Sequence, residues 1–405
     1  FEGDSVVLHW QAESTPLADL EKVSIEPDIG DVAESGSLEF SNIRETARYT
    51  VRAHSKIWNV KSVRIHALKP YCEGYDQVTG SAYRVGLEVS MPDDDKPGPH
   101  PAVVIIHGGS FSGGDMIELA AYADEAVKRD YVAVNINYRL LPADEDATNY
   151  SWPAALQDVK CAIRYVRANA GSFNIDVNRI GVMGHSAGGY LATMLGLTGQ
   201  ADVAAFDDVG QYPGRDDSVA ALVSIAAPLD LIDAYEHLRN TVILDPEFLL
   251  VESTLQASLD QIFETMGLYD DDEIDDADRT HPGYVASTPY TYIQNNAYGN
   301  LERPMMFIYG ESDIAIRPWN GCNFVDRVRA NAAAQQLEPQ AIMRQYMGEE
   351  ASHVAFVEAP VNGLVQSFTN YGRFLKQTLQ ESFDFFDVYL KGAPRDKLPV
   401  SNGCD

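Results

Sequence analysis

Residues 179–192 read RIGVMGHSAGGYLA, and this stretch decides the fold. An apolar run leads into a Gly-x-Ser-x-Gly pentapeptide centred on Ser186, and a second apolar run follows it. A strand that turns tightly into a helix needs small residues beside the serine, whose backbone is strained there. The pattern predicts a strand over 179–186, a helix over about 187–197, and a serine hydroxyl presented between them. A plain glycine-rich turn is the alternative, because the pentapeptide alone is common by chance.

From residue 56 onward the chain alternates strand-like and helix-like patterns on both sides of this turn. Strand patterns occur at 58–68, 82–91, 102–109, 131–138, 219–227, 305–310 and 341–347, and helical patterns at 116–129, 153–170 and 364–391. Strands that alternate with helices form a mostly parallel sheet covered on both faces. We therefore predict an α/β fold over residues 56–405.

Residues 229–303 interrupt this alternation. The segment is acidic, helical in part, and separates two predicted strands. An insertion of about 75 residues is too long for an ordinary connection, so we expect it to form a functional cap or lid.

Residues 1–55 have a different pattern, in which apolar and polar residues alternate in short runs. Examples are GDSVVLHW, VSIEPDIGDV, SGSLEF and ARYTVRA. Alternation with period two between turns is typical of a small antiparallel β-sandwich. The pieces resemble the bacterial immunoglobulin-like modules attached to secreted hydrolases, and the resemblance implies a further strand ahead of Phe1.

The composition is strongly acidic and argues against two kinds of partner. Asp and Glu total 60 against 30 Lys and Arg, which gives a formal charge of −30. Nucleic acid and anionic membrane surfaces repel such a chain. No apolar run is long enough to span a membrane, so we expect no membrane span. Adaptation to high salt and simple solubility explain the acidity equally well, and the oligomeric state stays open.

Four cysteines leave the disulfide pairing open: Cys72, Cys161, Cys322 and Cys404. None belongs to a Cys-x-x-Cys pair, which argues against a zinc or redox motif, and an even count permits one or two disulfides in a secreted protein. Cys161 lies in an apolar helical stretch, so we expect a buried free thiol there.

A serine hydroxyl is a weak nucleophile at neutral pH and needs a general base. In this strand–turn–helix setting the order along the chain is serine, then acid, then histidine. Of the three histidines after Ser186, His353 follows the last predicted strand, where a loop returns to the top of the sheet. We predict that His353 is the base, and that His237 and His281 in the insertion are structural or face the substrate.

The acid of the triad should follow the preceding strand, MMFIYG at 305–310, and Asp313 stands in the turn beyond it. Its expected role is to hold the imidazole tautomer and to stabilise the imidazolium. Glu311 in the same turn is the nearer alternative, and Asp230 after the earlier strand is the more distant one.

Backbone N–H groups must bind the oxyanion that forms when a carbonyl is attacked. The segment HGGSF at 107–111 follows a buried strand, and its two glycines let the backbone approach a bound carbonyl closely. We predict three donors: Gly108, Gly109 and Ala187. Two histidines beside these motifs are expected to brace their loops rather than to transfer protons: His107 and His185.

The motifs HGGSF, NYRL at 137–140, WPAALQDVKCAIRYVRANA and RIGVMGHSAGGYLA resemble the hormone-sensitive-lipase-like branch of the α/β hydrolases. Within it the chain is similar to secreted bacterial esterases related to acetylxylan and feruloyl esterases. The resemblance covers roughly residues 57–391 and implies a carboxylic-ester hydrolase fold and triad, in a secreted or extracytoplasmic location. The family usually has a third glycine at Ser110 and HGF where this chain has HVAF at 353–356, which leaves the substrate choice open.

Four residues near these motifs are expected to contact the substrate: Ser110, Phe111, Tyr138 and Trp319. Core positions suit Tyr138, Trp319 and also Trp152 at least as well. No metal and no cofactor are expected, because no His-Glu-x-x-His, P-loop or Rossmann pattern occurs. The acidic run 269–276 lacks the spacing and glycine of a calcium loop, so we expect a solvated face there.

These residues predict acyl transfer from an ester to water. We expect short-chain, carbohydrate-linked or aromatic esters, as small molecules or attached to a polymer. An amidase of the arylformamidase type is the rival enzyme, since its motifs also include HGG and GHSAG. A binding protein on a hydrolase scaffold is the rival of another class; such proteins typically lose a triad member, and all three are present here.

Overall fold

The computed structural model separates into two compact units. One holds Phe1–Lys69 with Glu88–Ser90, and the other holds Pro70–Leu87 with Met91–Asp405. The structure describes residues 5–11, 20–26, 30–32, 35–41, 48–55, 61–66, 69–75, 82–92, 96–141, 152–200, 206, 210, 212–240, 279–294, 296, 299–348, 351–353, 355–357 and 371–402. In the strands before residue 67 it describes the backbone alone.

The larger unit is built on an eight-stranded sheet with the order β14-β13-β12-β11-β9-β10-β8-β7. Its strands are β7 Lys69–Tyr75, β8 Ala82–Ser90, β9 His100–Ile106, β10 Val132–Ile136, β11 Ile175–His185, β12 Ala221–Ile225, β13 Met305–Gly310 and β14 Ala341–Tyr346. From β10 to β14 every neighbouring pair is parallel, which confirms the mostly parallel sheet that the sequence predicts. Parallel strands end at the same edge, so the loops that follow them meet there.

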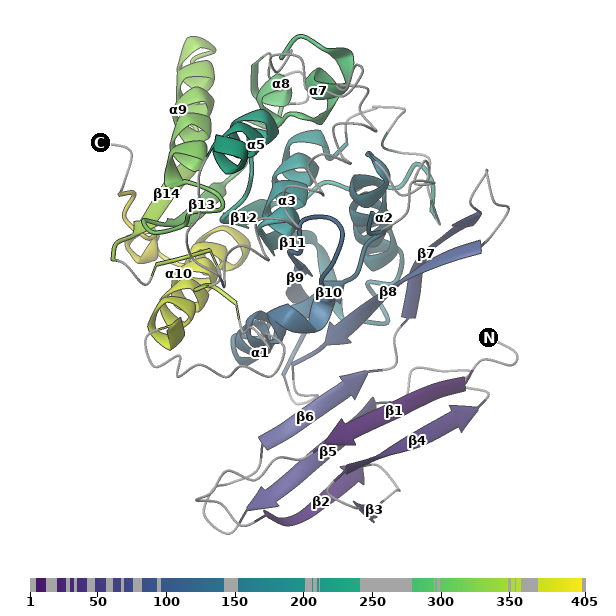
Figure 1. Ribbon diagram of the computed structural model, residues 1–405. Helices are drawn as coiled ribbons and strands as arrows, with labels where there is room; N and C mark the ends of the chain where they lie inside the picture. The colour runs from purple at the N-terminus through teal and green to yellow at the C-terminus, as the bar shows by residue number, and fades with distance from the viewer. Residues whose placement is uncertain are drawn as a thin grey trace. The chain divides into compact units, whose positions relative to one another are not determined.

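Helices cover both faces of this sheet (Figure 1). The 3-10 turn Met116–Leu119, α1 Ala120–Lys128 and α10 Tyr371–Lys391 pack on one face, with alternate strand residues such as Val103 and Ile105. The opposite face carries α2 Ala154–Ala168, α3 Ala187–Thr198 and α9 Pro318–Ala334. A short 3-10 turn, Arg395–Lys397, follows α10. Strands β9, β10, β12 and β13 are buried along their whole length, as expected for strands covered on both sides.

The smaller unit consists of antiparallel strands. They are β1 Ser5–Gln11, β2 Leu20–Glu26, β3 Gly30–Val32, β4 Ser35–Ser41, β5 Arg48–Ser55 and β6 Lys61–His66. β1 pairs with β4, and a second sheet has the order β3-β2-β5-β6. The sequence places the end of this module at residue 55, whereas the compact unit continues to Lys69 because β6 pairs with β5.

Between β12 and β13 the described chain is helical. It forms α5 Leu231–Asn240, α7 Pro282–Ser287 and α8 Pro289–Gln294, and α8 packs against α3 and α9. Residues 241–278, with the acidic run 269–276, lie outside the described part of the chain. The cap predicted over 229–303 therefore stays a prediction, to which these three helices contribute.

Two cysteines meet between the edge strand β7 and helix α2. Cys72 and Cys161 are buried free thiols, so the free thiol predicted at Cys161 is confirmed. A hydrogen bond to Cys161, together with burial, raises the pKa of the Cys72 thiol. Gly210 lies against both sulfurs with φ of 84°, and a side chain at this position would overlap them. Cys322 takes part in a disulfide, and Cys404 lies outside the described residues.

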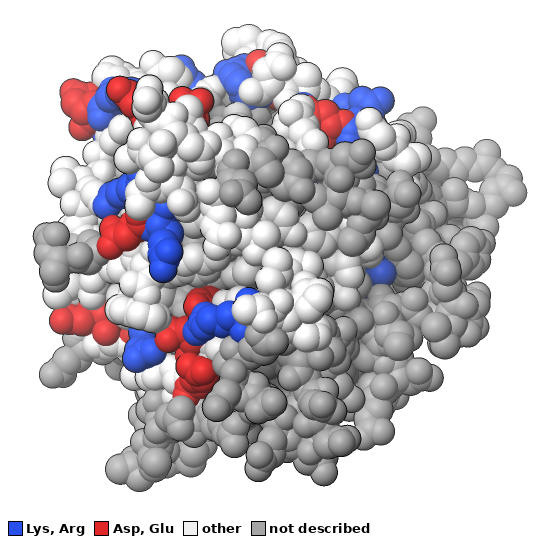
Figure 2. All heavy atoms as spheres, turned by 90° about the horizontal axis from the view of Figure 1, so that it is seen from above, with Lys and Arg blue, Asp and Glu red and all other residues white. Residues whose placement is uncertain are grey.

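Acidic and basic side chains are mixed on the face shown in Figure 2. Lys and Arg lie beside Asp and Glu in small groups that are separated by uncharged areas. Ion pairs of this mixed kind occur among the described residues, such as Arg344 with Glu381 at 2.7 Å. Salt adaptation of the acidic chain stays a prediction. No helix in the described ranges is both long and apolar enough to cross a membrane.

Candidate active site

The serine predicted as nucleophile stands between the end of β11 and the start of α3. Ser186 has φ of 54° and ψ of −120°, a strained conformation for a residue with a side chain. Its N–H donates to the carbonyl of Ile225 on β12 at 2.7 Å, which fixes the turn against the sheet. Gly188 lets α3 start beside β9, because a Cβ there would overlap the carbonyl of Ile106. The predicted strand, turn and helix are therefore present.

The structure brings together the serine, histidine and aspartate that the sequence singled out. The Nε2 atom of His353 lies 2.9 Å from the Oγ of Ser186. The Nδ1 atom of the same ring lies 2.8 Å from Oδ2 of Asp313. All three side chains are buried. With Asp313 accepting the Nδ1 proton, Nε2 is free to accept the proton of the serine hydroxyl.

The carboxylate of Asp313 is fixed by its own turn. Its Oδ1 accepts the backbone N–H groups of Ala315 at 3.0 Å and Ile316 at 2.8 Å, while Oδ2 faces His353. Both alternatives for the acid have other partners. Glu311 accepts the N–H of Gly348 at 2.7 Å, and Asp230 pairs with Arg279.

The residue before the nucleophile links its turn to the histidine loop. His185 donates from Nε2 to the backbone carbonyl of His353 at 2.8 Å, and the two rings lie 5.0 Å apart. Burial, and then the neighbouring His353, lower the pKa of His185 to about 3. His185 is therefore neutral at ordinary pH, with its single proton on Nε2, and it braces the loop as the sequence predicts.

The loop after β9 lies beside the nucleophile. A Cβ built on Gly108 would stand 3.1 Å from the Cβ of Ser186, so the backbone of Gly108 runs directly past the serine. The carbonyl of Gly109 accepts the N–H groups of Ser112 and Gly113, which closes the loop on itself. Ala187 is the first residue of α3, where backbone N–H groups have no partner within the helix. Gly108 and Ala187 thus lie beside Ser186, and oxyanion binding by Gly108, Gly109 and Ala187 stays a prediction.

The rings of Tyr138 and His107 stack on each other and contact the loop after β9. The ring of Tyr138 lies 4.4 Å from that of His107, nearly parallel to it, and its hydroxyl donates to the carbonyls of His107 and Gly108 at 3.2 and 3.1 Å. His107 in turn donates from Nδ1 to the carbonyl of Gly108 at 2.7 Å, and burial lowers its pKa. Tyr138 is 3% exposed, and its contacts in the structure are with the loop after β9. A contact between Tyr138 and the substrate stays a prediction.

The other predicted substrate contacts lie at the same edge of the sheet. Ser110 and Phe111 have φ of 53° and 63°, and the Phe111 ring meets the ring of Tyr190 edge-on at 5.5 Å. Trp319 is the second residue of α9, is 51% exposed, and has the guanidinium of Arg317 above its ring at 5.7 Å. Trp152 is partly buried, and its ring meets those of Tyr190 and Phe206. Substrate contacts by Ser110, Phe111 and Trp319 stay predictions.

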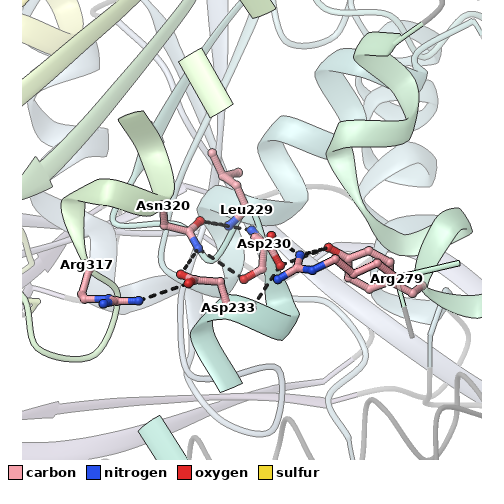
Figure 3. Close-up of polar contacts among 7 residues, drawn as sticks. Leu229, Asp230, Asp233, Arg279, Arg317 and Asn320 are labelled. Atoms are coloured by element: carbon pink, nitrogen blue, oxygen red, sulfur yellow. Dashed lines mark hydrogen bonds and ion pairs between the residues drawn. The ribbon is translucent and has the colours of Figure 1, made fainter. Parts of the chain in front are cut away.

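A polar network beside the acid turn was not identified from the sequence (Figure 3). The Asn320 amide oxygen accepts the N–H groups of Leu229 at 2.7 Å and Asp230 at 3.1 Å. Asp230 is in turn bound by Arg279 and by the hydroxyl of Tyr284 at 3.0 Å. These contacts join α5, α7 and α9. No spacing in the sequence indicates them, because the partners are far apart along the chain.

The two histidines of the insertion have structural contacts. His281 caps the start of α7 by accepting the N–H of Gly283 at 3.1 Å. His237 on α5 has its Nε2 3.0 Å from the carbonyl of Ile314, next to the acid of the triad. Among the residues that the structure describes, no group of three or more His, Cys, Asp or Glu side chains is placed to hold a metal ion.

Residues 87–268 match the family model BD-FAE. The match begins in β8 and takes in the loop after β9 and the nucleophile turn.

Several curated proteins with sequence similarity to this chain are named as esterases. The chain is 28% identical over 255 residues to the Esterase LipC of Mycobacterium tuberculosis, which covers 62% of this chain and 53% of that protein. It is 34% identical over 124 residues to the Carboxylesterase NlhH of the same species, covering 30% and 35% of the two chains. The chain thus spans about half, or less, of the length of these curated relatives.

Solved structures show the fold. The chain is similar to the propionate-bound thermophilic esterase Est2 of Thermogutta terrifontis, with a TM-score of 0.53 and 20% identity over 81% of this chain and 96% of that one. A structure titled "Truncated form of carbohydrate esterase from gut microbiota" matches with a TM-score of 0.53 and 20% identity, over 80% and 96% of the two chains. The larger unit therefore has the α/β-hydrolase fold, with its mostly parallel eight-stranded sheet.

Proposed function

We propose that this protein is a serine carboxylesterase that acts through an acyl-enzyme intermediate. One observation carries the proposal: Ser186, His353 and Asp313 form a continuous chain of contacts at 2.9 and 2.8 Å. The contacts run from hydroxyl to imidazole to carboxylate, in the order that activates a serine. The similarity to curated esterases supports the same activity.

Acylation begins when Nε2 of His353 accepts the proton of the Ser186 hydroxyl. The Oγ atom attacks the ester carbonyl, and the carbonyl oxygen becomes an oxyanion that is bound by the N–H groups of Gly108, Gly109 and Ala187. The C–O bond to the alcohol then breaks, and the imidazolium of His353 returns its proton to the leaving alcohol. Asp313 stabilises the imidazolium throughout.

Deacylation repeats these events with water. His353 accepts a proton from a water molecule, whose oxygen attacks the acyl carbonyl in the same oxyanion site. The intermediate collapses, the proton returns to Oγ of Ser186, and the carboxylic acid leaves. No step needs a metal or a cofactor.

The substrate class is proposed to be carbohydrate-linked or aromatic esters, free or attached to a polymer. Trp319 supports this, because its exposed ring at the start of α9 offers a flat apolar face to a sugar or aryl ring. The solved structure described as a carbohydrate esterase from gut microbiota supports the same class.

The smaller unit is proposed to be an immunoglobulin-like spacer, and the chain to work outside the cytoplasm. The antiparallel pairs β1–β4 and β3-β2-β5-β6 support a two-sheet module of this kind.

Hydrolysis of p-nitrophenyl acetate and butyrate tests the activity, with Ser186→Ala compared to wild type. We expect kcat/KM to fall by at least about a thousandfold, because the nucleophile is lost. Ser172→Ala, at an exposed position beyond α2, is the matched control and should keep wild-type rates. Unchanged turnover in Ser186→Ala would refute the proposal. Rates on acetylated xylan, methyl ferulate and N-formylkynurenine then separate carbohydrate, aromatic and amide substrates.

A further inference from the structure

Helix α5 contacts the turn that carries the acid of the triad at two points. The Nε2 of His237 donates to the carbonyl of Ile314 at 3.0 Å, and the carboxylate of Asp233 accepts from the guanidinium of Arg317 at 3.1 Å. Asp233 and His237 are four residues apart, so they lie on the same face of α5. One face of this helix therefore holds both ends of the segment 314–317.

The same turn holds the carboxylate of the triad. Oδ1 of Asp313 accepts the N–H groups of Ala315 and Ile316, and this leaves Oδ2 directed at His353. A shift of the 314–317 backbone would therefore move both donors of Oδ1. The orientation of Oδ2 toward the imidazole would change with them.

Helix α5 is itself anchored where it begins. The buried Asn320 amide accepts from the N–H groups of Leu229 and Asp230 and donates to Asp230 O and to Asp233 Oδ2, at 2.7 to 3.3 Å (Figure 3). The carboxylate of Asp233 thus receives both the Asn320 amide and the Arg317 guanidinium. Asn320 is 1% exposed, so these bonds are shielded from water and stronger than surface contacts.

We propose that Asp233 and His237 are positioning residues for the hydrolysis proposed above. They act through the 314–317 segment to keep the carboxylate of Asp313 aligned with Nδ1 of His353. The inference rests on the proposed function and deepens it, because it assigns α5, at the start of the insertion, a role in the rate of the chemistry. Charged or titratable groups on α5 and the turn are Asp233, Glu236 and His237, with Asp313 and Arg317. Those facing them from other elements are Asp230, Arg279, Tyr284 and Tyr290 around the start of α5, and His353 with His185 beside Asp313.

The expected effect is intermediate in size. Replacing a triad carboxylate by an amide costs about 10⁴-fold in kcat, because the wrong tautomer is favoured. A carboxylate that stays in place but is held loosely loses part of that contribution. We therefore expect His237→Ala and Asp233→Ala each to lower kcat by about tenfold. KM should change less than about twofold, because the contacts of both side chains are with the acid turn.

The test compares His237→Ala, His237→Gln and Asp233→Ala on p-nitrophenyl butyrate. The glutamine amide can donate to the Ile314 carbonyl, so His237→Gln should recover most of the lost kcat. In the alanine variants the acidic limb of the pH profile of kcat/KM should move to lower pH, because the imidazolium of His353 is less stabilised. The rate at which a fluorophosphonate labels Ser186 in the folded fraction gives the same comparison for variants that fold poorly.

Arg179→Ala is the matched control, since it removes an ion pair with Asp176 (2.7 Å, N to O) in the first part of β11, outside this network. It should leave kcat and the pH profile unchanged. The proposal is overturned if both alanine variants keep kcat within twofold of wild type, or if KM alone changes. It is also overturned if glutamine at 237 behaves as alanine does. Ester hydrolysis that depends on Ser186 in the wild type would still stand in each of those cases, so the two proposals fail separately.

Discussion

The neutral state of His185 predicts how the stability of the larger unit depends on pH. His185 is 6% exposed, and its pKa is lowered to about 3 by burial and by His353. In the unfolded chain the pKa of a histidine is about 6.5. Below that pH the unfolded state therefore binds a proton at His185, whereas the folded state does not. The stability that His185 contributes as a neutral ring is therefore complete above about pH 6.5 and is lost as the pH falls toward 3.

The size of the destabilisation through His185 depends on how far the pH falls below the pKa of the unfolded state. Each pH unit below the unfolded pKa costs about 1.4 kcal/mol, so lowering the pH from about 8 to about 5 should destabilise the wild type by about 2 kcal/mol through this residue. His185→Gln removes the titration while its amide can still donate to the carbonyl of His353. Other groups titrate in both proteins, so their contributions largely cancel in the difference.

Urea unfolding at the two pH values measures this effect, with the transition of the larger unit followed by intrinsic fluorescence. The free energy of unfolding of His185→Gln should fall by about 2 kcal/mol less than that of the wild type between about pH 8 and 5. An equal fall in both proteins would refute the reasoning, because it would mean that His185 is protonated in the folded state.

Two further substitutions test other parts of the structure. Asp313→Asn should lower kcat about 10³- to 10⁴-fold with little change in stability, since an amide donor facing His353 favours the wrong tautomer. The control Glu311→Gln, in the same turn, should leave kcat unchanged. Equal losses of kcat in both variants would contradict the assignment of Asp313 as the acid. Gly210→Ala should destabilise the protein by about 2 to 4 kcal/mol in thermal or urea unfolding, because a methyl group would overlap two thiol sulfurs at a positive φ. Gly214→Ala, at a φ of 71° with open space around it, should cost only about 1 kcal/mol, and equal costs at both positions would argue against that packing.

The nucleophile turn could be predicted from the sequence because its determinants are local. Small residues flank Ser186, an apolar strand precedes it, and an apolar helix follows, so a few neighbours specify the turn. Asp313 and His353 were predicted from their place after successive strands. Parallel strands bring such positions to one edge of the sheet, and the structure confirms that the three side chains meet.

The contacts around the acid turn could not be predicted in the same way. Asn320 and Leu229 are 91 positions apart, and His237 and Ile314 are 77 apart, so no local pattern connects them. Tyr138 shows the same limit: its aromatic ring suits a pocket or a core equally well, and only the fold reveals that it stacks on His107. Strand β7 was also missed, since KPYCEGY lacks the alternation of a typical strand.

The paired thiols under the edge strand give the protein an internal reporter of partial opening. Cys72 belongs to β7, the edge strand of the larger sheet, and Cys161 belongs to helix α2. Both cysteines are fully buried. A thiol reagent can reach them when β7 separates from α2, even if the centre of the sheet stays intact. The rate of labelling, compared with the rate of global unfolding, would therefore measure how much more easily this edge opens than the strands that carry the triad.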